Sequence, residues 1–258
     1  MKEQIRSEFS RQAASMAAAP AFADANVLKG IIDALGSFQV GRVLDVACGP
    51  GFVAEAIAPI ASEIVGIDVT PEMVALAEAR LRKAGFTKAA FRTACAEKLP
   101  FGPAEFDTVV TRLSFHHFPD LPAVLAEIRR VLRSGGRLLV ADVISSSDPE
   151  KSALHNALER LRDPTHVRML PHPALVAALR SGGFEPCYEE SWDQQRTFKE
   201  WVKIVAAPDR TEPLRYVMRA LARAGLDAGI RLREMEGDLL FTHTWLILIA
   251  EPTFAAGV

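Results

Sequence analysis

Short apolar runs alternate with amphipathic stretches along much of the chain. Runs typical of buried strands lie at residues 42–47, 63–68, 88–93, 106–112 and 136–143. Stretches with the apolar spacing of a helix follow three of these runs, at 52–60, 70–84 and 121–132. Strands that alternate with helices pair in parallel through right-handed crossovers. The pattern therefore predicts an α/β fold built on a mostly parallel sheet.

The two ends of the chain follow this alternation less regularly. Residues 2–35 have helical spacing with a break at Pro20. Towards the other end, the pattern predicts a helix at 173–181, strands at 184–192 and 239–250, and two helices between those strands, at 197–206 and 212–224. About 40 residues thus separate the last two strands, which is too many for a simple loop. We expect a helical insertion there.

The composition is that of one large domain. With 258 residues, 49% of them hydrophobic, the chain can bury a substantial core. We expect a single domain with an N-terminal helical segment (1–36), a core (40–145) and a helical insertion (194–237). The formal net charge of −2 gives no reason to expect a nucleic-acid partner.

Cysteine spacing and the first residues bear on metal sites and on location. Cys48, Cys95 and Cys187 form neither a CxxC pair nor a metal-ligand spacing, so no metal site is expected. The start of the chain is charged and polar, unlike a secretion signal, and no apolar run is long enough to span a bilayer. The cytoplasm is therefore the expected location. A homodimer is compatible with the sequence.

The first strand runs into a glycine-containing turn and then a helix. Gly49 and Gly51 lack a Cβ, so the backbone can turn tightly and approach a ligand, and the spacing from Gly49 to Ala54 fits the dinucleotide fingerprint G-x-G-x-x-A. Asp45 lies in the end of the strand, where a charge is costly unless a ligand or backbone amides receive it. Asp68 ends the next strand, at about the distance expected of a carboxylate that binds a ribose diol. The alternative is a pair of turn glycines with two helix-capping aspartates.

The residues of this turn resemble a known motif. Asp45-Val46-Ala47-Cys48-Gly49-Pro50-Gly51 is similar to motif I of the class I S-adenosylmethionine-dependent methyltransferases, and in particular to the branch that contains the ubiquinone and menaquinone biosynthesis C-methyltransferases. The resemblance covers roughly residues 40–145. It implies a Rossmann-like, mostly parallel sheet of seven strands with helices on both faces, and an N-terminal helix that acts as a lid.

The resemblance also implies an activity and a cofactor. The activity is in-line transfer of a methyl group from S-adenosylmethionine to a small-molecule acceptor. The cofactor would be bound by Asp45, Ala47, Gly49, Gly51, Asp68, Val69, Met73, Cys95, Ala96, Glu97 and Arg112.

Two positions depart from the family pattern. Cys95 stands where the family usually has an aspartate that accepts a hydrogen bond from the adenine amino group, although the backbone amide of Ala96 can still serve the ring. Met16 stands where a tyrosine is frequent, so the role of that hydroxyl is absent. These departures leave open a protein of the same fold with another activity, such as a cyclase or a decarboxylase. A dinucleotide-dependent oxidoreductase is the remaining alternative, disfavoured because Asp45 lies in the strand and no second glycine turn follows.

Bases that remove a proton from the acceptor are expected at the ends of the fourth and fifth strands. His116 and His117 follow the fourth strand, and an imidazole titrates near neutral pH, so both are candidate catalytic residues. The alternative is that one ring caps the next helix or packs on the cofactor. Asp142 ends the fifth strand, where it is either a base or, as we favour, the partner of Arg112 in an ion pair.

His166 is the third candidate catalytic residue. It lies in the segment Asp163-Pro164-Thr165-His166-Val167-Arg168, where it can face the substrate. The alternative, which we favour, is a turn ordered by an ion pair between Asp163 and Arg168.

Large side chains also lie outside the regular strand and helix alternation. Phe9 and Met16 are on the N-terminal segment, and Trp201 and Tyr216 are on the insertion. A methyl donor reacts best away from bulk water, so we expect these four side chains to close over the acceptor. The alternative is that these helices simply complete the core.

Overall fold

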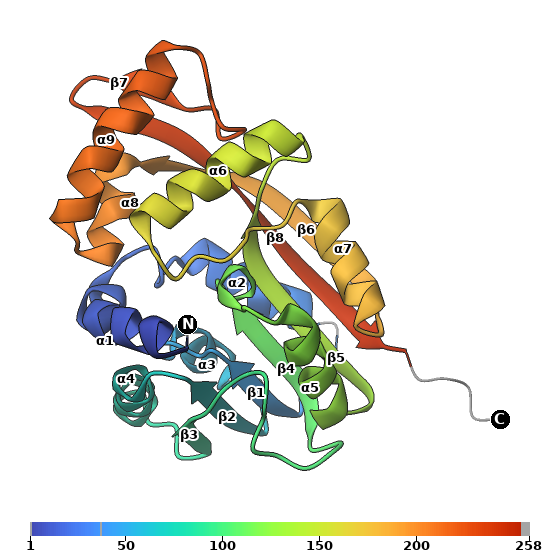
Figure 1. Cartoon of the computed structure of the whole chain (residues 1–258). Coiled ribbons are helices and arrows are strands. Elements are labelled where there is room, and N and C mark those ends of the chain that lie inside the picture. The colour runs from blue at the N-terminus through green and yellow to red at the C-terminus, as the bar shows by residue number, and fades with distance from the viewer. Residues whose placement is uncertain (1, 37, 254–258) are drawn as a thin grey trace.

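A mixed β-sheet runs through the centre of the protein (Figure 1). The computed structural model describes residues 2–36 and 38–253. Within these residues the strands are β1 (Arg42–Val46), β2 (Glu63–Asp68), β3 (Ala89–Thr93), β4 (Phe106–Arg112), β5 (Leu132–Ile144), β6 (Phe184–Thr197), β7 (Arg233–Met235) and β8 (Asp238–Pro252).

Helices connect most of the strands. In the described part of the chain they are α1 (Lys2–Ala18), α2 (Ala25–Leu35), α3 (Phe52–Ile57), α4 (Pro71–Lys83), α5 (Leu121–Val131), α6 (Pro149–Arg162), α7 (His172–Ser181), α8 (Phe198–Val205) and α9 (Pro208–Arg223), with a single 3₁₀ turn, η1 (Phe115–His117). None of these helices is long and apolar enough to cross a membrane.

The strand order agrees with the predicted fold class. Along the sheet the strands lie in the order β3-β2-β1-β4-β5-β8-β6, and β7 pairs with β8. Strands β1 to β5 pair in parallel, whereas β8 is antiparallel to the three strands it pairs with, β5, β6 and β7. The prediction of an α/β, mostly parallel sheet is confirmed. The expected number of seven strands is wrong, because within the described residues the short β7 adds an eighth.

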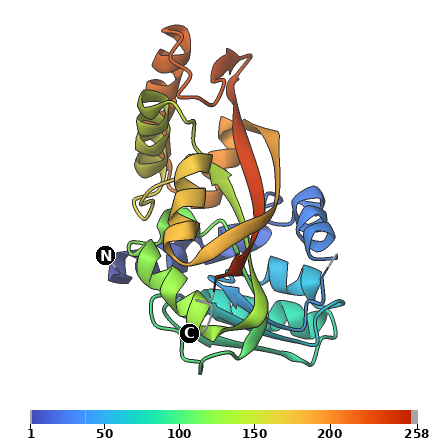
Figure 2. The ribbon, with the colours of Figure 1, turned by 90° about the vertical axis from the view of Figure 1, so that its right-hand side faces the viewer.

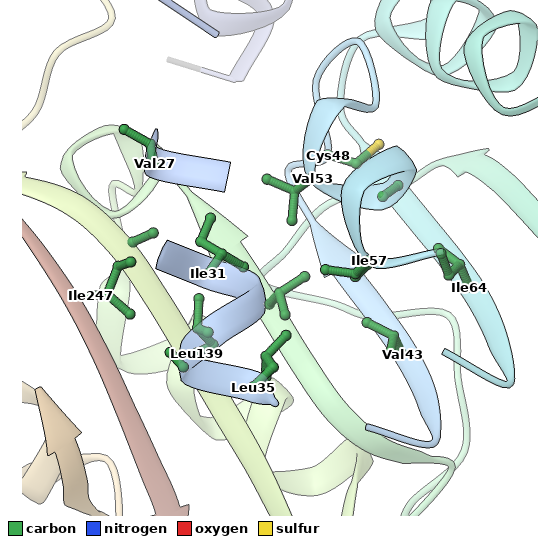
Figure 3. Close-up of a cluster of buried hydrophobic side chains, with 14 of the residues drawn as sticks. Val27, Ile31, Leu35, Val43, Cys48, Val53, Ile57, Ile64, Leu139 and Ile247 are labelled. Carbon is green, nitrogen blue, oxygen red and sulfur yellow. The ribbon is translucent and has the colours of Figure 1, made fainter. Parts of the chain in front are cut away.

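Apolar clusters hold helices against both faces of the sheet. On one face, Ile31 and Leu35 of α2 lie beside Leu139 of β5 and Ile247 of β8 (Figure 3). On the opposite face, α5 and α7 pack against β4, β5 and β8. A third cluster joins α6, α8 and α9 to the first half of β8. We call α6, α8, α9 and β7 the cap, which lies at the upper end of β6 and β8 (Figure 2).

The cap contains both a predicted and an unpredicted part. The helical insertion between the last two strands is confirmed by α8 and α9. Helix α6 was not predicted, although Asp148 caps it by accepting hydrogen bonds from the amides of Glu150 and Lys151. The buried face of α6 carries His155 and Glu159 as well as apolar residues, so apolar periodicity does not reveal it.

Tyr216 does not cover the acceptor region, which corrects the expectation from the sequence. Its side chain is on α9 and is 69% exposed, whereas Trp201 on α8 is only 5% exposed and packs into the cap. Helical spacing places both residues on the insertion, but it does not decide which face of each helix meets the rest of the protein.

We predict that Gly51→Ala destabilises the protein more than Gly85→Ala. Both glycines have φ of +83°, so each substitution carries the left-handed cost of about 1–2 kcal/mol. A Cβ on Gly51 would also approach Ala77 of α4 to 2.9 Å, whereas a Cβ on Gly85 meets nothing within 4 Å. This crowding adds about 1–3 kcal/mol. Thermal unfolding of both variants measures the difference, and equal losses in Tm would show that the approach to α4 does not matter.

Candidate functional site

A cavity opens at the carboxyl ends of β1, β2 and β4, the edge at which such sheets bind ligands. All of the cofactor-binding residues predicted from the sequence line this cavity except Gly51: Asp45, Ala47, Gly49, Asp68, Val69, Met73, Cys95, Ala96, Glu97 and Arg112. Gly51 instead lies against Ala77 of α4, so its missing Cβ serves the packing of two helices. We call this space the first cavity.

The carboxylate of Asp68 holds the glycine turn to the end of β2. Its Oδ2 accepts a hydrogen bond from the amide of Gly49 at 3.0 Å, and its Oδ1 accepts one from the amide of Thr70 at 2.9 Å. Burial raises the pKa of Asp68, while these two amides act in the opposite direction. The turn therefore reaches the cavity wall in a shape set by a side chain of the neighbouring strand.

Asp45 is the electrostatically unusual residue of the first cavity. Its side chain is buried, with 1% exposed, and its Oδ2 has no hydrogen-bond partner. Burial and the nearby charge of Asp68 raise the pKa of Asp45 to about 8. A buried carboxylate oxygen without a donor is costly, and a cationic ligand in the cavity would relieve that cost.

The segment after β3 forms another part of the wall. The thiol of Cys95 donates a hydrogen bond to the carboxylate of Glu97. A carboxylate is thus present close to the position where the methyltransferase pattern carries an aspartate, although Cys95 itself supplies none.

A second cavity adjoins the first. The two share wall residues from α1, from the segment after it and from the segment after β4: Phe9, Met16, Phe22, Leu113 and His117. The second cavity extends under the cap, where Trp201 and Trp245 give it apolar walls. Its polar lining comes from Gln12, from the histidines of η1 and from six further charged or titratable side chains: Glu159, Arg162, Asp163, Arg196, Glu200 and His243.

His116 lines the second cavity and is held by a buried carboxylate. Its Nδ1 donates to Oδ1 of Asp142 at 2.7 Å, and Oδ2 of Asp142 accepts from the amide of Phe115 at 3.0 Å. Burial alone would favour the neutral ring, but the charge of Asp142 and the hydrogen bond to it outweigh burial and raise the pKa of His116. The hydrogen bond to Asp142 fixes Nδ1 of His116 and leaves Nε2 as the ring nitrogen that can act on a ligand.

The expected ion pair between Asp142 and Arg112 is wrong. Asp142 bonds to His116, while the guanidinium of Arg112 donates to the carbonyl oxygens of Phe22 at 2.7 Å and Ala21 at 3.1 Å. Arg112 thereby fixes the segment between α1 and α2 over the cavity. Both side chains end neighbouring strands, and the sequence does not show which neighbour each one meets.

His117 and His166 differ from His116 in their partners. The Nδ1 of His117 donates to the carbonyl oxygen of Thr165 at 3.2 Å, and burial together with the charge of His116 lowers the pKa of His117 to about 4. The Nε2 of His166 donates to Oδ1 of Asn156 at 2.8 Å, and burial with the charge of His116 lowers its pKa to about 2. His166 lines neither cavity, so it is placed to support the fold around Asn156.

The turn after α6 is ordered without the expected pair of Asp163 and Arg168. Asp163 accepts hydrogen bonds from the amide and the hydroxyl of Thr165, at 2.9 and 2.6 Å, and from the side-chain amide of Gln12 at 3.3 Å. Arg168 is exposed. Gln12 is on α1, so Asp163 also ties the N-terminal helix to the cap.

Three buried titratable residues beside the second cavity were not predicted from the sequence. His155 and Glu159 lie on α6, which was not predicted, and His243 lies on β8. Their signal is present in the sequence: the pair on α6 is spaced for one helix face, and His243 interrupts the apolar alternation from Phe241 to Trp245.

Comparison with known proteins shows which family of proteins this chain is similar to. The family described as "Methyltransferase domain" matches residues 44–140. The uncharacterized methyltransferase YcgJ of Bacillus subtilis is 34% identical over 167 residues, which are 65% of this chain and 66% of that protein. The solved structure of YcgJ superposes with a TM-score of 0.82 at 27% identity, covering 89% of this chain and 99% of that chain.

Two further relatives have named activities. The 27-O-demethylrifamycin SV methyltransferase of Amycolatopsis mediterranei is 35% identical over 178 residues, 67% of this chain and 63% of that protein. The ubiquinone/menaquinone biosynthesis C-methyltransferase UbiE of a Geobacter strain is 34% identical over 119 residues, 45% of this chain and 51% of that protein. The chain spans between 48% and 66% of the length of the first curated relatives that it matches.

Proposed function

We propose that this chain, which belongs to the class I S-adenosylmethionine-dependent methyltransferases, transfers a methyl group to a small-molecule acceptor. The acceptor is held in the second cavity. The observation that carries the proposal is that the two cavities share one wall. A donor in the first cavity and an acceptor in the second would meet beside Phe9, Leu113 and His117. In-line transfer needs donor and acceptor to be held in such contact.

The residues of the first cavity suit S-adenosylmethionine, the cofactor of this family. Asp68 would offer a carboxylate to the ribose hydroxyls, and the segment Cys95–Glu97 would lie at the adenine. Asp45 would offer its unpartnered oxygen to the positively charged methionine end. When bound, the cofactor would supply a methyl group from its sulfonium, and the electron pair of the broken carbon–sulfur bond would stay on the sulfur. The chain's own part is to bind, to orient and to exclude water.

His116 is the base that removes the proton from the acceptor. It lines the second cavity, and Asp142 holds its Nδ1 so that Nε2 is the nitrogen left for the acceptor. A catalytic base works best when its pKa is near the working pH. Among the three histidines the pKa of His116 is raised, while those of His117 and His166 are lowered far below neutrality. His117 serves as a neutral residue that lines both cavities, and His166 supports the fold.

Helix α1 of the N-terminal segment and helix α8 of the insertion close the second cavity around the acceptor. Arg11 on α1 donates to the carbonyl oxygen of Ala206 at 3.0 Å, and Ser15 donates to that of Ile204 at 2.7 Å. These bonds join the N-terminal helix to the C-terminal end of α8, beside the second cavity. They support a lid that keeps water from the transfer step.

The acceptor is a free small molecule and not a nucleic acid, because the formal net charge of −2 offers no general attraction to phosphates. The protein acts in the cytoplasm, and a homodimer remains a prediction.

The proposed function predicts specific binding of S-adenosylmethionine and product methylation. Isothermal titration should show binding of S-adenosylmethionine but not of NAD, and Asp68→Ala should weaken it by about 1.5–3 kcal/mol, while the exposed Asp33→Ala control does not. A panel of hydroxylated and amine acceptors is then screened for S-adenosylhomocysteine formation, with mass spectrometry of the product. Acceptor conversion without a mass gain of one methylene unit would favour a cyclase or decarboxylase.

We predict that binding of S-adenosylmethionine releases a proton from Asp45. In the free protein the pKa of Asp45 is about 8, so at about pH 7 the carboxyl is mostly protonated. A cationic ligand favours the carboxylate, and the proton leaves. Titrations in buffers of different ionisation enthalpy measure the proton count for the wild type, for Asp45→Asn and for the surface control Asp33→Asn. Asp45→Asn should bind more weakly and release fewer protons; an unchanged proton count would rule out this role of Asp45.

We predict that Asp142→Asn lowers the pH midpoint of turnover. Base catalysis requires neutral His116, so kcat rises as the ring loses its proton, with a midpoint above the usual pKa of 6.5. Removing the charge of Asp142 removes what raises the pKa, so the midpoint moves down and the plateau rate falls. His116→Gln should cost on the order of 10²–10⁴-fold in kcat. The surface variant His172→Gln is the control, and a pH profile unaltered by Asp142→Asn would exclude His116 as the base.

A further inference from the structure

Three buried side chains of α6 and β8 converge on one point. The Nε2 of His155 is 3.8 Å from Oε1 of Glu159, and the Nε2 of His243 is 3.6 Å from the same oxygen. All three atoms lie within 4.8 Å of one another. The residues are buried, with exposed fractions of 2% for His155, 3% for Glu159 and 6% for His243.

Hydrogen bonds within the protein do not explain this cluster. Both Nε2 atoms are buried, and neither has a hydrogen-bond partner. Their distances to Glu159 exceed the range of a nitrogen–oxygen hydrogen bond, which ends near 3.2 Å. Buried polar atoms without partners are rare and each costs free energy. Two imidazole nitrogens and a carboxylate oxygen that face one point form a donor set for a cation.

The two elements present these side chains by ordinary geometry. His155 and Glu159 are one helical turn apart on α6, so they share a face. His243 occupies an inward position of β8, between Phe241 and Trp245 on the same side of the strand. The rings of His155 and His243 lie 5.6 Å apart, and the rings of Trp201 and Phe241 surround His243 at 6.4 and 5.1 Å. An aromatic shell of this kind restricts access of water to a metal site.

Arg162 occupies the other oxygen of the carboxylate. Its Nε is 3.2 Å from Oε2 of Glu159, and its guanidinium donates to the carbonyl oxygen of Trp201 at 3.1 Å. A carboxylate that binds a metal through one oxygen is commonly held through the other by an outer group. Arg162 and Arg196 both line the second cavity. Their positive charges are offset by the negative charges of Asp163 and Glu200, which line it too.

We propose that His155, Glu159 and His243 bind one divalent transition-metal ion of the zinc class, with an open coordination position towards the second cavity. Two imidazoles and one carboxylate are a known ligand set for such ions when a fourth position is left free. Bonds of about 2.0–2.2 Å to the ion require the three donor atoms to draw together by a few tenths of an ångström to about 1 Å. Rotation of the side chains suffices for such a change.

Because Glu159 and His243 also line the second cavity, the open position faces the acceptor. An acceptor with an oxygen donor, such as a phenol or a hydroxy acid, would then be oriented by the ion. This part rests on the proposed function, whereas the metal site itself does not. The expectation of no metal site considered only the cysteines, and the cluster is independent of them.

Metal titration of the full chain tests the site directly. Chelator-treated protein is titrated with Zn²⁺ by calorimetry and with Co²⁺ by visible absorption, in the absence of cofactor and acceptor. We expect one ion per chain, and a Co²⁺ spectrum of a four- or five-coordinate site. His155→Gln, Glu159→Gln and His243→Gln should lose this binding. The control is His172→Gln, because His172 pairs with Glu189 on the surface at 2.9 Å and should leave the binding unchanged.

Folding and function are separated by two further measurements. Zn²⁺ should raise the Tm of the wild type and of His172→Gln but not that of the ligand variants. If one ligand variant fails to fold, the other two decide. Absence of one-to-one binding in the wild type, or its retention in two folded ligand variants, overturns the proposal. A protein that binds Zn²⁺ but not S-adenosylmethionine would contradict the proposed function and leave the metal site standing.

Discussion

Strand β8 buries both of its faces along most of its length, and the structure is arranged around that requirement. It pairs antiparallel with β5 on one side and β6 on the other, which places it inside the sheet. Leu246 and Leu248 point into the cluster beneath α5 and α7, whereas Ile247 points into the cluster beneath α2. Phe241, near the start of the same strand, packs in the cluster that holds the helices of the cap. One strand therefore joins the part of the sheet covered by α2, α5 and α7 to the cap, and the second cavity lies where these two parts meet.

Buried carboxylates at strand ends acquire different chemistry from different partners. Asp68 receives two backbone amides and shapes the glycine turn. Asp142 receives an amide and the ring of His116, whose basicity it increases. Asp45 keeps one oxygen without a partner, and its pKa is raised to about 8. The same type of side chain is thus a scaffold in Asp68, an orienting group in Asp142 and a carboxyl with an unpartnered oxygen in Asp45, according to how fully the protein satisfies it.

Because the three histidines pack closely together, only one of them is readily protonated. The ring of His116 lies 4.3 Å from that of His117 and 5.5 Å from that of His166. A positive charge on His116 disfavours a second charge on either neighbour, and only His116 has a carboxylate partner among the three. Neighbouring residues of the same type are therefore not interchangeable candidates for a base.

The sequence by itself determined the α/β alternation, the glycine turn, and the edge of the sheet at which Asp45 and Asp68 lie. These features follow from local periodicity and from the rule that parallel strands end on one edge. Tertiary structure alone decided that Asp142 meets His116 instead of Arg112, that His166 bonds Asn156, and that Tyr216 faces solvent. It also revealed α6, whose polar buried face hides it from apolar patterns, and brought His243 of β8 to His155 and Glu159. Such pairings depend on distances between segments remote in the chain, which no local pattern encodes.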